Sequence, residues 1–287
     1  MLVWLASYPR SGNTFLRIIL REVFGVETYS LYRETEETCP VAAGGMDRQE
    51  TDGPSAGDPY DVARYADRAE LDVVKTHHPP FDDRQAIYVI RDGREAISSY
   101  FHYLRDIDHK DSDMLAVIAG LVSFGSWGDH VRRWDPLSRP NTLLLRFERL
   151  VADPIGHIPL LAEFLDIAPI GDRIPTFEEL HQIAPKFFRS GRTDSWRSQF
   201  SPNELSLLEA LHGDVLAEYG YPFESPGDVR PGSSLRELIR RVDEERQQLH
   251  SLAVWQGDEL RKHQMILADA ATAVRKLEES LTPGRAA

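Results

Sequence analysis

The segment YPRSGNTF, residues 8–15, combines one cation with small residues that leave backbone amides accessible. It follows the apolar run 2–7 and precedes a helix-like pattern, so its amides should lie at a helix N-terminus, where anions bind. A Walker-type loop carries two glycines and a Lys-Ser/Thr pair for magnesium triphosphate. Here the first glycine is missing, and Asn13 and Thr14 stand at the positions of that pair. The segment therefore predicts an anion site of another kind, with Arg10 as its cation.

A lysine and a histidine stand at the end of the next strand-like run, in KTHHP at 75–79. The carboxyl ends of parallel strands meet at one edge of a sheet, so this segment is expected beside the Arg10 loop. There Lys75 can supply a positive charge, and His77 can act as a general base. Taken alone, His77 could equally be a hydrogen-bonded loop histidine without a catalytic role.

A second anion site is predicted in IRDGREAISSY, residues 90–100. Arg91 stands at a strand end, and Ser98 and Ser99 fall in the first turns of the helix that follows. Taken alone, Arg91 could be a salt-bridge arginine. Two separate anion sites with a base between them, and no carboxylate pattern for magnesium, indicate a nucleotide with two spaced anionic groups.

The elements that must position these residues alternate along the chain, which is typical of an α/β fold with a parallel β-sheet flanked by helices. The run at 85–93 is continuously apolar, as in a strand covered on both faces. The segment 201–221 begins with a serine cap, a proline and a glutamate at capping-box spacing, and should be the last helix of the globular part. Strands are expected at 2–7, 71–80, 85–93 and 141–148, and helices at about 13–24, 94–104, 114–134 and 201–221.

Composition narrows the classes of function. The net charge of −13 argues against non-specific nucleic-acid binding, so an anion site must be a local basic pocket. No apolar run approaches the roughly 20 residues that span a bilayer, and no signal peptide is expected. The single cysteine, Cys39, excludes an intrachain disulfide and fits a reducing compartment. We therefore expect a cytoplasmic protein that binds neither nucleic acid nor membrane.

Four further segments complete the expected domain organisation. Residues 1–223 form the main domain, in which 33–70 is an acidic loop or lid without periodicity. Its acidity could favour a cationic or amine-bearing acceptor, although a solvated lid explains it as well. Residues 224–234 read as a linker rich in glycine and proline, and 282–287 as a disordered tail.

Residues 235–281 predict one long helix, which would measure about 70 Å at 1.5 Å per residue. Apolar residues recur at 3/4 spacing, with a slip between Leu252 and Leu260 that resembles a coiled-coil stutter. Such a helix needs a partner to bury its apolar stripe. A coiled coil that joins copies into a homodimer or higher homo-oligomer is the preferred interpretation, and folding back onto the domain is the alternative.

Six segments resemble, in the same order, motifs of the soluble sulfotransferases that use 3′-phosphoadenosine 5′-phosphosulfate (PAPS), of the bacterial type with an added C-terminal coiled coil. YPRSGNTF is similar to their 5′-phosphosulfate loop Y-P-K-S-G-T-T-W, KTHHP to the catalytic K-T-H-L-P, and YVIRDGREAISSYFHY to the 3′-phosphate motif. FGSWGDHVRRW at 124–134, LRFERLVADP at 145–154 and FFRSGRTDSWRSQFSPNE at 187–204 resemble three further segments of the family. The resemblance covers about residues 1–221. It implies a P-loop NTPase-like sulfotransferase fold, to which a long C-terminal helix is added.

The resemblance also implies a role for individual residues. His77 would be the general base, Lys75 would contact the transferring sulfuryl group, and Arg10 would stabilise the leaving oxygen. Acceptor binding, to a hydroxyl or amine of a small molecule or carbohydrate, would fall to His78, Trp127 and His130. No metal is required, and the product would be 3′-phosphoadenosine 5′-phosphate (PAP). Donor binding would involve Arg10, Ser11, Gly12, Asn13, Thr14, Phe15, Arg91, Ser99, Phe147, Phe188, Arg189, Ser190 and Gly191, with Trp196 supporting the terminal loop.

Two other functions remain as alternatives to sulfuryl transfer. A P-loop kinase would consume ATP with magnesium, although the missing glycine and the missing Lys-Ser/Thr pair argue against it. A non-catalytic scaffold would use its coiled coil and keep only a vestigial nucleotide site. The presence of both Lys75 and His77 at a strand end disfavours that interpretation.

Overall fold

The computed structural model describes residues 1–32, 71–110, 112–185, 187–188 and 195–221. The chain divides into two units, Met1–Pro231 and Gly232–Ala287, and every described residue belongs to the first. Within this described part, no helix combines the length and the apolar character that crossing a bilayer requires. The predicted segments 33–70 and 224–287 lie outside the described residues.

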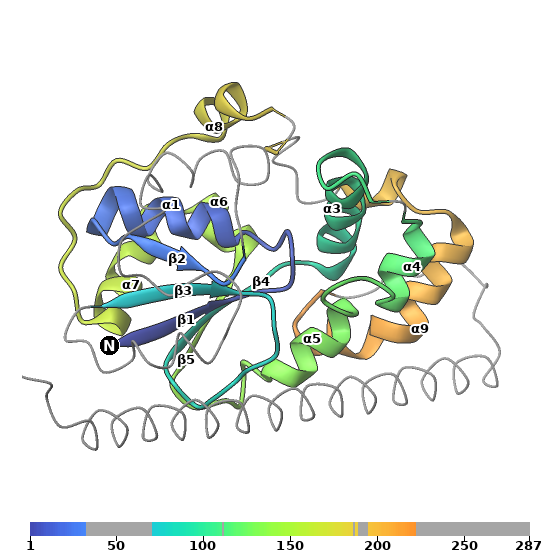
Figure 1. The fold of residues 1–287 in the computed structure, drawn as a ribbon, viewed down its shortest axis with the longest axis horizontal. Coiled ribbons are helices and arrows are strands. Elements are labelled where there is room, and N and C mark those ends of the chain that lie inside the picture. Colours follow the sequence, from blue (N-terminus) through green and yellow to red (C-terminus); the bar gives the residue numbers. More distant parts are fainter. Residues whose placement is uncertain (33–70, 111, 186, 189–194, 222–287) are drawn as a thin grey trace, which may run out of the picture. The chain divides into compact units, whose positions relative to one another are not determined.

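A five-stranded parallel sheet forms the centre of the first unit (Figure 1), as the alternation of strand and helix patterns predicts. The strand order is β2-β3-β1-β4-β5, and all four pairings are parallel. Because the strands run in one direction, the loops after β1, β3 and β4 gather at one edge of the sheet. The strands span Leu2–Ala6 (β1), Thr28–Ser30 (β2), Asp72–Thr76 (β3), Ala86–Ile90 (β4) and Thr142–Arg146 (β5).

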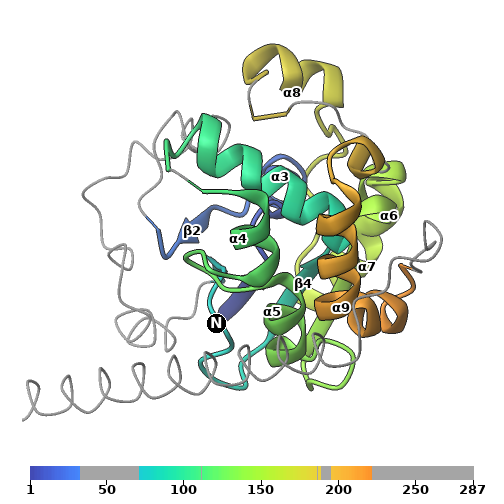
Figure 2. The ribbon, with the colours of Figure 1, turned by 90° about the vertical axis from the view of Figure 1, so that its right-hand side faces the viewer.

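Helices cover both faces of this sheet (Figures 1 and 2), so the side chains of a strand alternate between two apolar cores. Val3 and Leu5 of β1 pack with residues of α1, α6 and α7, whereas Leu2 and Trp4 pack with residues of α3, α4, α5 and α9. The α-helices are Asn13–Phe24 (α1), Gly93–Asp106 (α3), Met114–Ala119 (α4), Trp127–Trp134 (α5), Phe147–Ala152 (α6), Ile158–Leu165 (α7), Phe177–Ile183 (α8) and Pro202–Glu218 (α9), with 3-10 turns at Ile155–His157 (η2) and Ser195–Ser198 (η3).

Local capping explains where the helices that frame the site begin. Asp92 caps α3, because its side chain accepts a hydrogen bond from the backbone N–H of Arg94. Ser201 and Glu204 form the predicted capping box of α9. In contrast, α1 begins at Gly12 without a side-chain cap, so the first amides of α1 are not satisfied by a capping side chain.

The single helix predicted at 114–134 is wrong, because the structure contains two helices there. Gly120 ends α4 at φ +75°, and a Cβ at this position would lie 2.3 Å from the backbone nitrogen of Ser126. Ser126 then caps α5 by accepting a hydrogen bond from the N–H of Asp129. The chain therefore turns sharply at a position where only glycine fits. The three-residue strand β2 and the helices α6, α7 and α8 were not expected from the sequence.

Candidate active site

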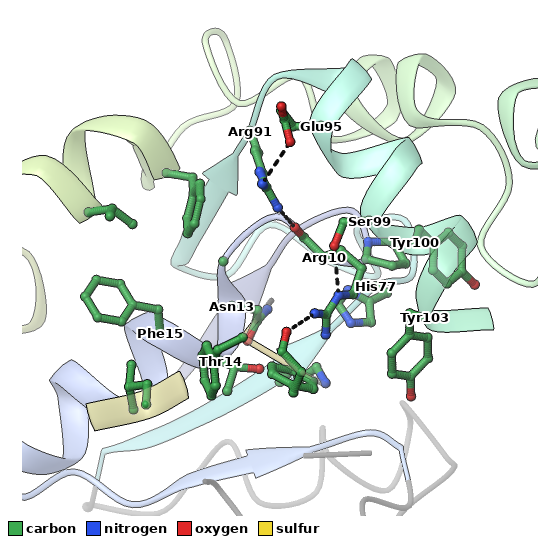
Figure 3. Close-up of a pocket in the computed structure, with 18 of the residues that line it drawn as sticks. Arg10, Asn13, Thr14, Phe15, His77, Arg91, Glu95, Ser99, Tyr100 and Tyr103 are labelled. Carbon is green, nitrogen blue, oxygen red and sulfur yellow. Dashed lines mark hydrogen bonds and ion pairs between the residues drawn. The ribbon is translucent and has the colours of Figure 1, made fainter. Parts of the chain in front are cut away.

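A cavity of about 510 Å³ lies where the loops after β1, β3 and β4 meet α3 and α8. It brings together the three segments in which the sequence predicts anion binding and base chemistry, shown in Figure 3. Its walls include Arg10, Gly12, Asn13, Thr14, Phe15, Tyr32, Lys75, His77, Arg91, Glu95, Ser98, Ser99, Tyr100, Tyr103, Phe124, Phe147, Phe177, Leu180, Phe187 and Phe188.

The loop after β1 exposes its backbone to the cavity through two unusual conformations. Arg10 has φ +64° and Gly12 has φ +105°, both in the left-handed region. A Cβ on Gly12 would lie 2.2 Å from Cδ2 of Phe147, so the backbone passes directly against that ring. Only glycine permits this close approach.

Polar groups of the same loop are buried without a complete set of partners. Asn13 donates from its side-chain nitrogen to the carbonyl of Leu5 at 3.1 Å and to Ser7 Oγ at 3.2 Å, which ties the loop to the end of β1. Oγ of Ser11 and Oδ1 of Asn13 are buried and have no hydrogen-bond partner among the described residues. Buried polar groups are rarely left unpaired, so a ligand is expected at this loop.

His77 is held in the protonation state that a general base needs. Its Nδ1 lies 2.7 Å from the carbonyl oxygen of Ser7, and a carbonyl can only accept, so Nδ1 carries the proton and Nε2 does not. Burial lowers the pKa of His77 well below its ordinary value, and the positive charge of Lys75 lowers this pKa further. The imidazole is therefore neutral at neutral pH.

Tyr32 supports His77 through a hydrogen bond and ring stacking. The backbone N–H of His77 donates to the Tyr32 hydroxyl at 2.6 Å, and the two rings stack with centroids 5.3 Å apart. Nζ of Lys75 lies 5.7 Å from the centre of the same tyrosine ring. The ring of Phe124 packs edge-on against both, with its centroid 5.2 Å from that of the Tyr32 ring and 5.3 Å from that of the His77 ring. An acceptor that reaches His77 therefore meets an aromatic wall.

The side chain of Arg10 points along the cavity toward α3 (Figure 3). Its Nε donates to Ser99 Oγ at 3.3 Å and its Nη2 to the carbonyl of Phe187 at 2.8 Å. The guanidinium carbon lies 4.0 Å from the centre of the Phe187 ring. One cation thus connects the loop after β1 to Ser99, the serine of the second predicted anion site.

Arg91 occupies the opposite side of the loop. Its Nη1 donates to the carbonyl of Arg10 at 3.0 Å, and its Nη2 lies 3.3 Å from Oε2 of Glu95. The guanidinium also packs 4.7 Å from the centre of the Phe147 ring. Burial lowers the pKa of Arg91 from its very high ordinary value, while Glu95 raises it. Nε of Arg91 is buried and has no partner among the described residues, so one donor remains for a ligand.

Apolar side chains form the remaining end of the cavity. The predicted residues Phe15, Phe147 and Phe188 all line it, together with Phe177 and Leu180 of α8. Phe15 and Phe188 pack on the cluster of Ile18 and Leu180. Such a wall suits a flat aromatic base rather than a charged group.

Three residues predicted to bind the acceptor do not line the cavity. Trp127 is fully buried at the start of α5. His130 is also buried, with Nδ1 2.8 Å from the Tyr88 hydroxyl and Nε2 3.1 Å from the carbonyl oxygen of His77. The carbonyl of His78 accepts from Nε1 of Trp134 at 2.8 Å. Arg189, Ser190 and Gly191 lie outside the described residues.

Two other wall residues, Tyr32 and Glu95, are not among the predicted site residues. Tyr32 precedes an aperiodic segment, so its approach to His77 depends on tertiary structure alone. Glu95 falls one helical turn after Arg91, at the i,i+4 spacing of an ion pair, and this spacing could have identified it. Among the described residues, no group of three or more His, Cys, Asp or Glu side chains is arranged to hold a metal ion.

Comparison with protein families adds an independent finding. Residues 2–220 match the family model described as a sulfotransferase domain. Sulfotransferase 1A1 of Bos taurus is 27% identical over 252 residues, which cover 74% of this chain and 82% of that protein. Flavonol 3-sulfotransferase of Flaveria bidentis is 23% identical over 265 residues, covering 76% of this chain and 82% of that protein.

Solved structures share the fold. Mouse sulfotransferase SULT7A1, crystallised with PAP, superposes with a TM-score of 0.56 at 18% identity, covering 85% of this chain and 88% of that one. Retinol dehydratase in complex with androsterone and PAP superposes with a TM-score of 0.54 at 20% identity, covering 79% and 83% of the two chains.

Proposed function

The chain belongs to the sulfotransferase family, whose enzymes transfer a sulfuryl group, and we propose that its cavity binds PAPS and delivers the sulfuryl group to an acceptor held against His77. The observation that carries the proposal is the meeting, in one cavity, of the loop after β1, the cation Arg91 and a neutral imidazole.

The residues present fit a donor with two anionic groups. The uncapped start of α1 and the unpaired Ser11 Oγ offer donors for the 5′-phosphosulfate. Arg91 and Ser99 are assigned to the 3′-phosphate, and Nε of Arg91 is an unused donor there. Phe15, Phe147 and Phe188 provide the apolar wall for the adenine. Bound in this way, PAPS supplies an activated sulfuryl group whose leaving group is the 5′-phosphate.

His77 and the neighbouring cations have different proposed roles in the transfer. His77 accepts the proton of the acceptor hydroxyl or amine at Nε2, because Nδ1 is already committed to the carbonyl of Ser7. Lys75 and Arg10 both line the cavity, and they are proposed to stabilise the negative charge that develops on oxygen during transfer. These groups act mainly by alignment and charge stabilisation, as in phosphoryl transfer.

Replacement of His77 tests this assignment directly. We expect His77→Ala to lower the transfer rate by about 100-fold or more, while the affinity for PAP, measured by calorimetry, changes little. His157→Gln is the matched control, because that side chain bonds to the backbone of Asp153 and does not line the cavity. Transfer is followed with labelled PAPS and a panel of phenols, alcohols and amines. A His77→Ala enzyme that turns over like wild type would rule out the base role.

A ligand comparison separates this function from the kinase and the scaffold. PAP should raise the melting temperature, because the cavity offers cations to both of its phosphates, whereas ATP with magnesium should have a smaller effect. Stabilisation by ATP alone would favour a kinase, and stabilisation by neither nucleotide would favour a scaffold.

The acceptor is proposed to be a small molecule or carbohydrate that carries a hydroxyl or an amine. The aromatic group of Tyr32, Phe124 and His77 supports an acceptor with an apolar or planar surface next to the reacting atom. His78, Trp127 and His130 remain proposed acceptor residues from their motif positions, although none of them lines the cavity.

We further propose that the protein is a sulfotransferase of the bacterial type and that it forms a homo-oligomer in the cytoplasm. The single cysteine supports a reducing compartment, and the apolar stripe of residues 235–281 supports association through a coiled coil. In this proposal residues 1–223 are the catalytic domain and residues 224–234 its linker to the coiled coil.

A further inference from the structure

Glu95 lies within the segment that resembles the 3′-phosphate motif, and it contacts three separate parts of the structure. It lies on α3, one turn after Arg91, and it is almost completely buried at 2% exposure. Its carboxylate accepts from Ser195 Oγ at 2.9 Å and from the backbone N–H of Trp196 at 2.8 Å. It also lies 3.3 Å from Nη2 of Arg91, as Figure 3 shows.

We propose that Glu95 is a positioning residue for donor binding, which orients Arg91 toward the 3′-phosphate and fixes η3 beside it. This inference rests on the proposed function, because it takes Arg91 as the cation of the 3′-phosphate. Glu95 itself does not bind the donor, since a carboxylate repels a phosphate.

The orientation of Arg91 follows from its surroundings. The guanidinium is fixed on three sides, by the carbonyl of Arg10, by the ring of Phe147 and by Glu95. The first two contacts hold its position in the cavity, and Glu95 has the largest effect among the carboxylates that act on its charge, ahead of Glu148 and Asp92. With Glu95 in place, Nε is left as a buried donor without a partner among the described residues. If the carboxylate is lost, only the carbonyl of Arg10 and the ring of Phe147 hold the guanidinium, and its orientation is less constrained.

The link to η3 adds a second function to the same carboxylate. Ser195 and Trp196 are distant from Glu95 in sequence, and their hydrogen bonds to it join α3 to η3. Trp196 also lies 4.3 Å from the guanidinium carbon of Arg94 on the same helix. Ser195 lines the cavity, so a shift of η3 changes the shape of the wall near Arg91.

Glutamine tests the charge without a large change in volume. In Glu95→Gln one carboxylate oxygen becomes an NH2 donor, which would face either the guanidinium of Arg91 or the N–H of Trp196, both of them donors, whereas the Ser195 hydroxyl can turn to accept. We expect the affinity for PAP to fall by about tenfold or more. The affinity for adenosine 5′-phosphate, which lacks the 3′-phosphate, should change less than twofold. Calorimetry with the full-length protein measures both constants.

Two further variants separate positioning from stability. Asp129→Asn breaks another i,i+4 pair with an arginine, Asp129 with Arg133 at 3.1 Å on α5, outside the cavity. It should leave the preference for PAP over adenosine 5′-phosphate unchanged. Ser195→Ala removes the hydrogen bond from Ser195 to Glu95 but keeps the ion pair between Glu95 and Arg91. It should therefore reduce the preference for PAP over adenosine 5′-phosphate less than Glu95→Gln does. Thermal unfolding of each protein without ligand checks that it is folded.

Each outcome distinguishes this inference from the function on which it rests. A wild-type protein that does not prefer PAP over adenosine 5′-phosphate would overturn the proposed donor. A wild-type preference that Glu95→Gln retains, or an equal loss for both ligands, would overturn the role of Glu95 alone. If Glu95→Gln unfolds, the same comparison with Ser195→Ala decides, since an unchanged preference there contradicts the inference.

Discussion

The side chain of Arg10 links the loop after β1 to the second proposed anion-binding region of the cavity. It reaches from the loop after β1 to Ser99 at 3.3 Å and to the carbonyl of Phe187 at 2.8 Å, and it stacks on the Phe187 ring. These contacts use the planar fork of an arginine, which a compact ammonium cannot reproduce. Charge and shape therefore make separable contributions at this position.

Two substitutions of Arg10 measure these contributions. Arg10→Gln should lower kcat by about 100-fold, because the charge near the leaving oxygen is lost. Arg10→Lys should recover most of kcat, since it keeps the charge, and should weaken PAPS binding by losing the fork contacts. Steady-state kinetics at varied PAPS concentration separate kcat from KM. Equal kcat values for the glutamine and lysine variants would contradict the charge role.

His130 makes the stability of the protein depend on pH. Burial lowers its pKa to about 3, although the hydrogen bond to the carbonyl of His77 raises it. The unfolded chain takes up the proton near pH 6.5 and the folded chain does not, so stability falls as the pH drops below 6.5. This one group contributes a slope of about 1.4 kcal/mol per pH unit between the two pKa values.

The variant His130→Gln removes this titration and keeps an N–H donor for the carbonyl of His77. Its free energy of unfolding should fall less steeply between pH 6 and pH 5 than that of wild type, by about 1.4 kcal/mol per unit. Urea unfolding at several pH values measures the slope. His109→Asn, at an exposed position with φ +51° that asparagine tolerates, is the control and should keep the wild-type slope. Identical slopes in wild type and His130→Gln would refute the assignment.

Residue types and their strand-end positions were sufficient to predict the polar part of the cavity. Arg10, His77 and Arg91 each follow a strand of one parallel sheet and Lys75 lies near the end of β3, so the topology brings them together. Side-chain direction within a helix was not predictable in the same way. Trp127 belongs to a recognisable motif, yet its side chain is buried in the core and does not line the cavity.

At the scale of elements, α1 depends on a glycine at each end. Gly12 at its N-terminus and Gly25 at its C-terminus both have positive φ, at +105° and +64°. A Cβ on Gly12 would meet the ring of Phe147 inside the cavity, whereas a Cβ on Gly25 would meet only the exposed side chain of Ile170. The two positions therefore share their backbone strain and differ in their relation to the site.

Alanine at each position separates strain from function. Gly12→Ala should both destabilise the protein and reduce PAP affinity by about tenfold or more, because the loop must move away from Phe147 and its amides move with it. Gly25→Ala should cost about 1 kcal/mol of stability and leave PAP affinity unchanged. Thermal unfolding and calorimetry on the same samples provide both values. A normal PAP affinity in Gly12→Ala would show that the loop amides do not hold the donor.

Element type was most predictable where the apolar pattern was continuous. The strands β1 and β4 are buried along their whole length, and their apolar runs identify them. The strand β2 has only three residues, which are too few for an alternating apolar pattern to be recognised. The helix α8 begins with a capping box of Thr176 and Glu179, a local signal that was present in the sequence but was not used.

At the scale of the whole molecule, the parallel sheet is predictable from alternation, but its strand order is not. Right-handed crossovers permit several orders, and the observed order is β2-β3-β1-β4-β5. The order places β1 in the centre, between β3 and β4, so the loops after these three strands are neighbours. The arrangement of the candidate site residues thus depends on the topology rather than on any one segment.

The proposed coiled coil can be tested in the full-length chain, because its seam is defined by sequence spacing. Leu238→Glu combined with Val242→Glu places charges on the apolar stripe, at positions where a coiled coil buries its side chains. We expect wild type to be a dimer or larger by light scattering, and this variant to be a monomer, since buried unpaired carboxylates oppose association. Its affinity for PAP should stay at the wild-type value, because every residue assigned to the donor lies before residue 222.

Gln247→Glu with Gln248→Glu adds the same charge off the stripe and should keep the oligomer. If the variant with Leu238 and Val242 replaced has the same assembly mass as wild type, the alternative is favoured, in which the helix folds back onto its own domain.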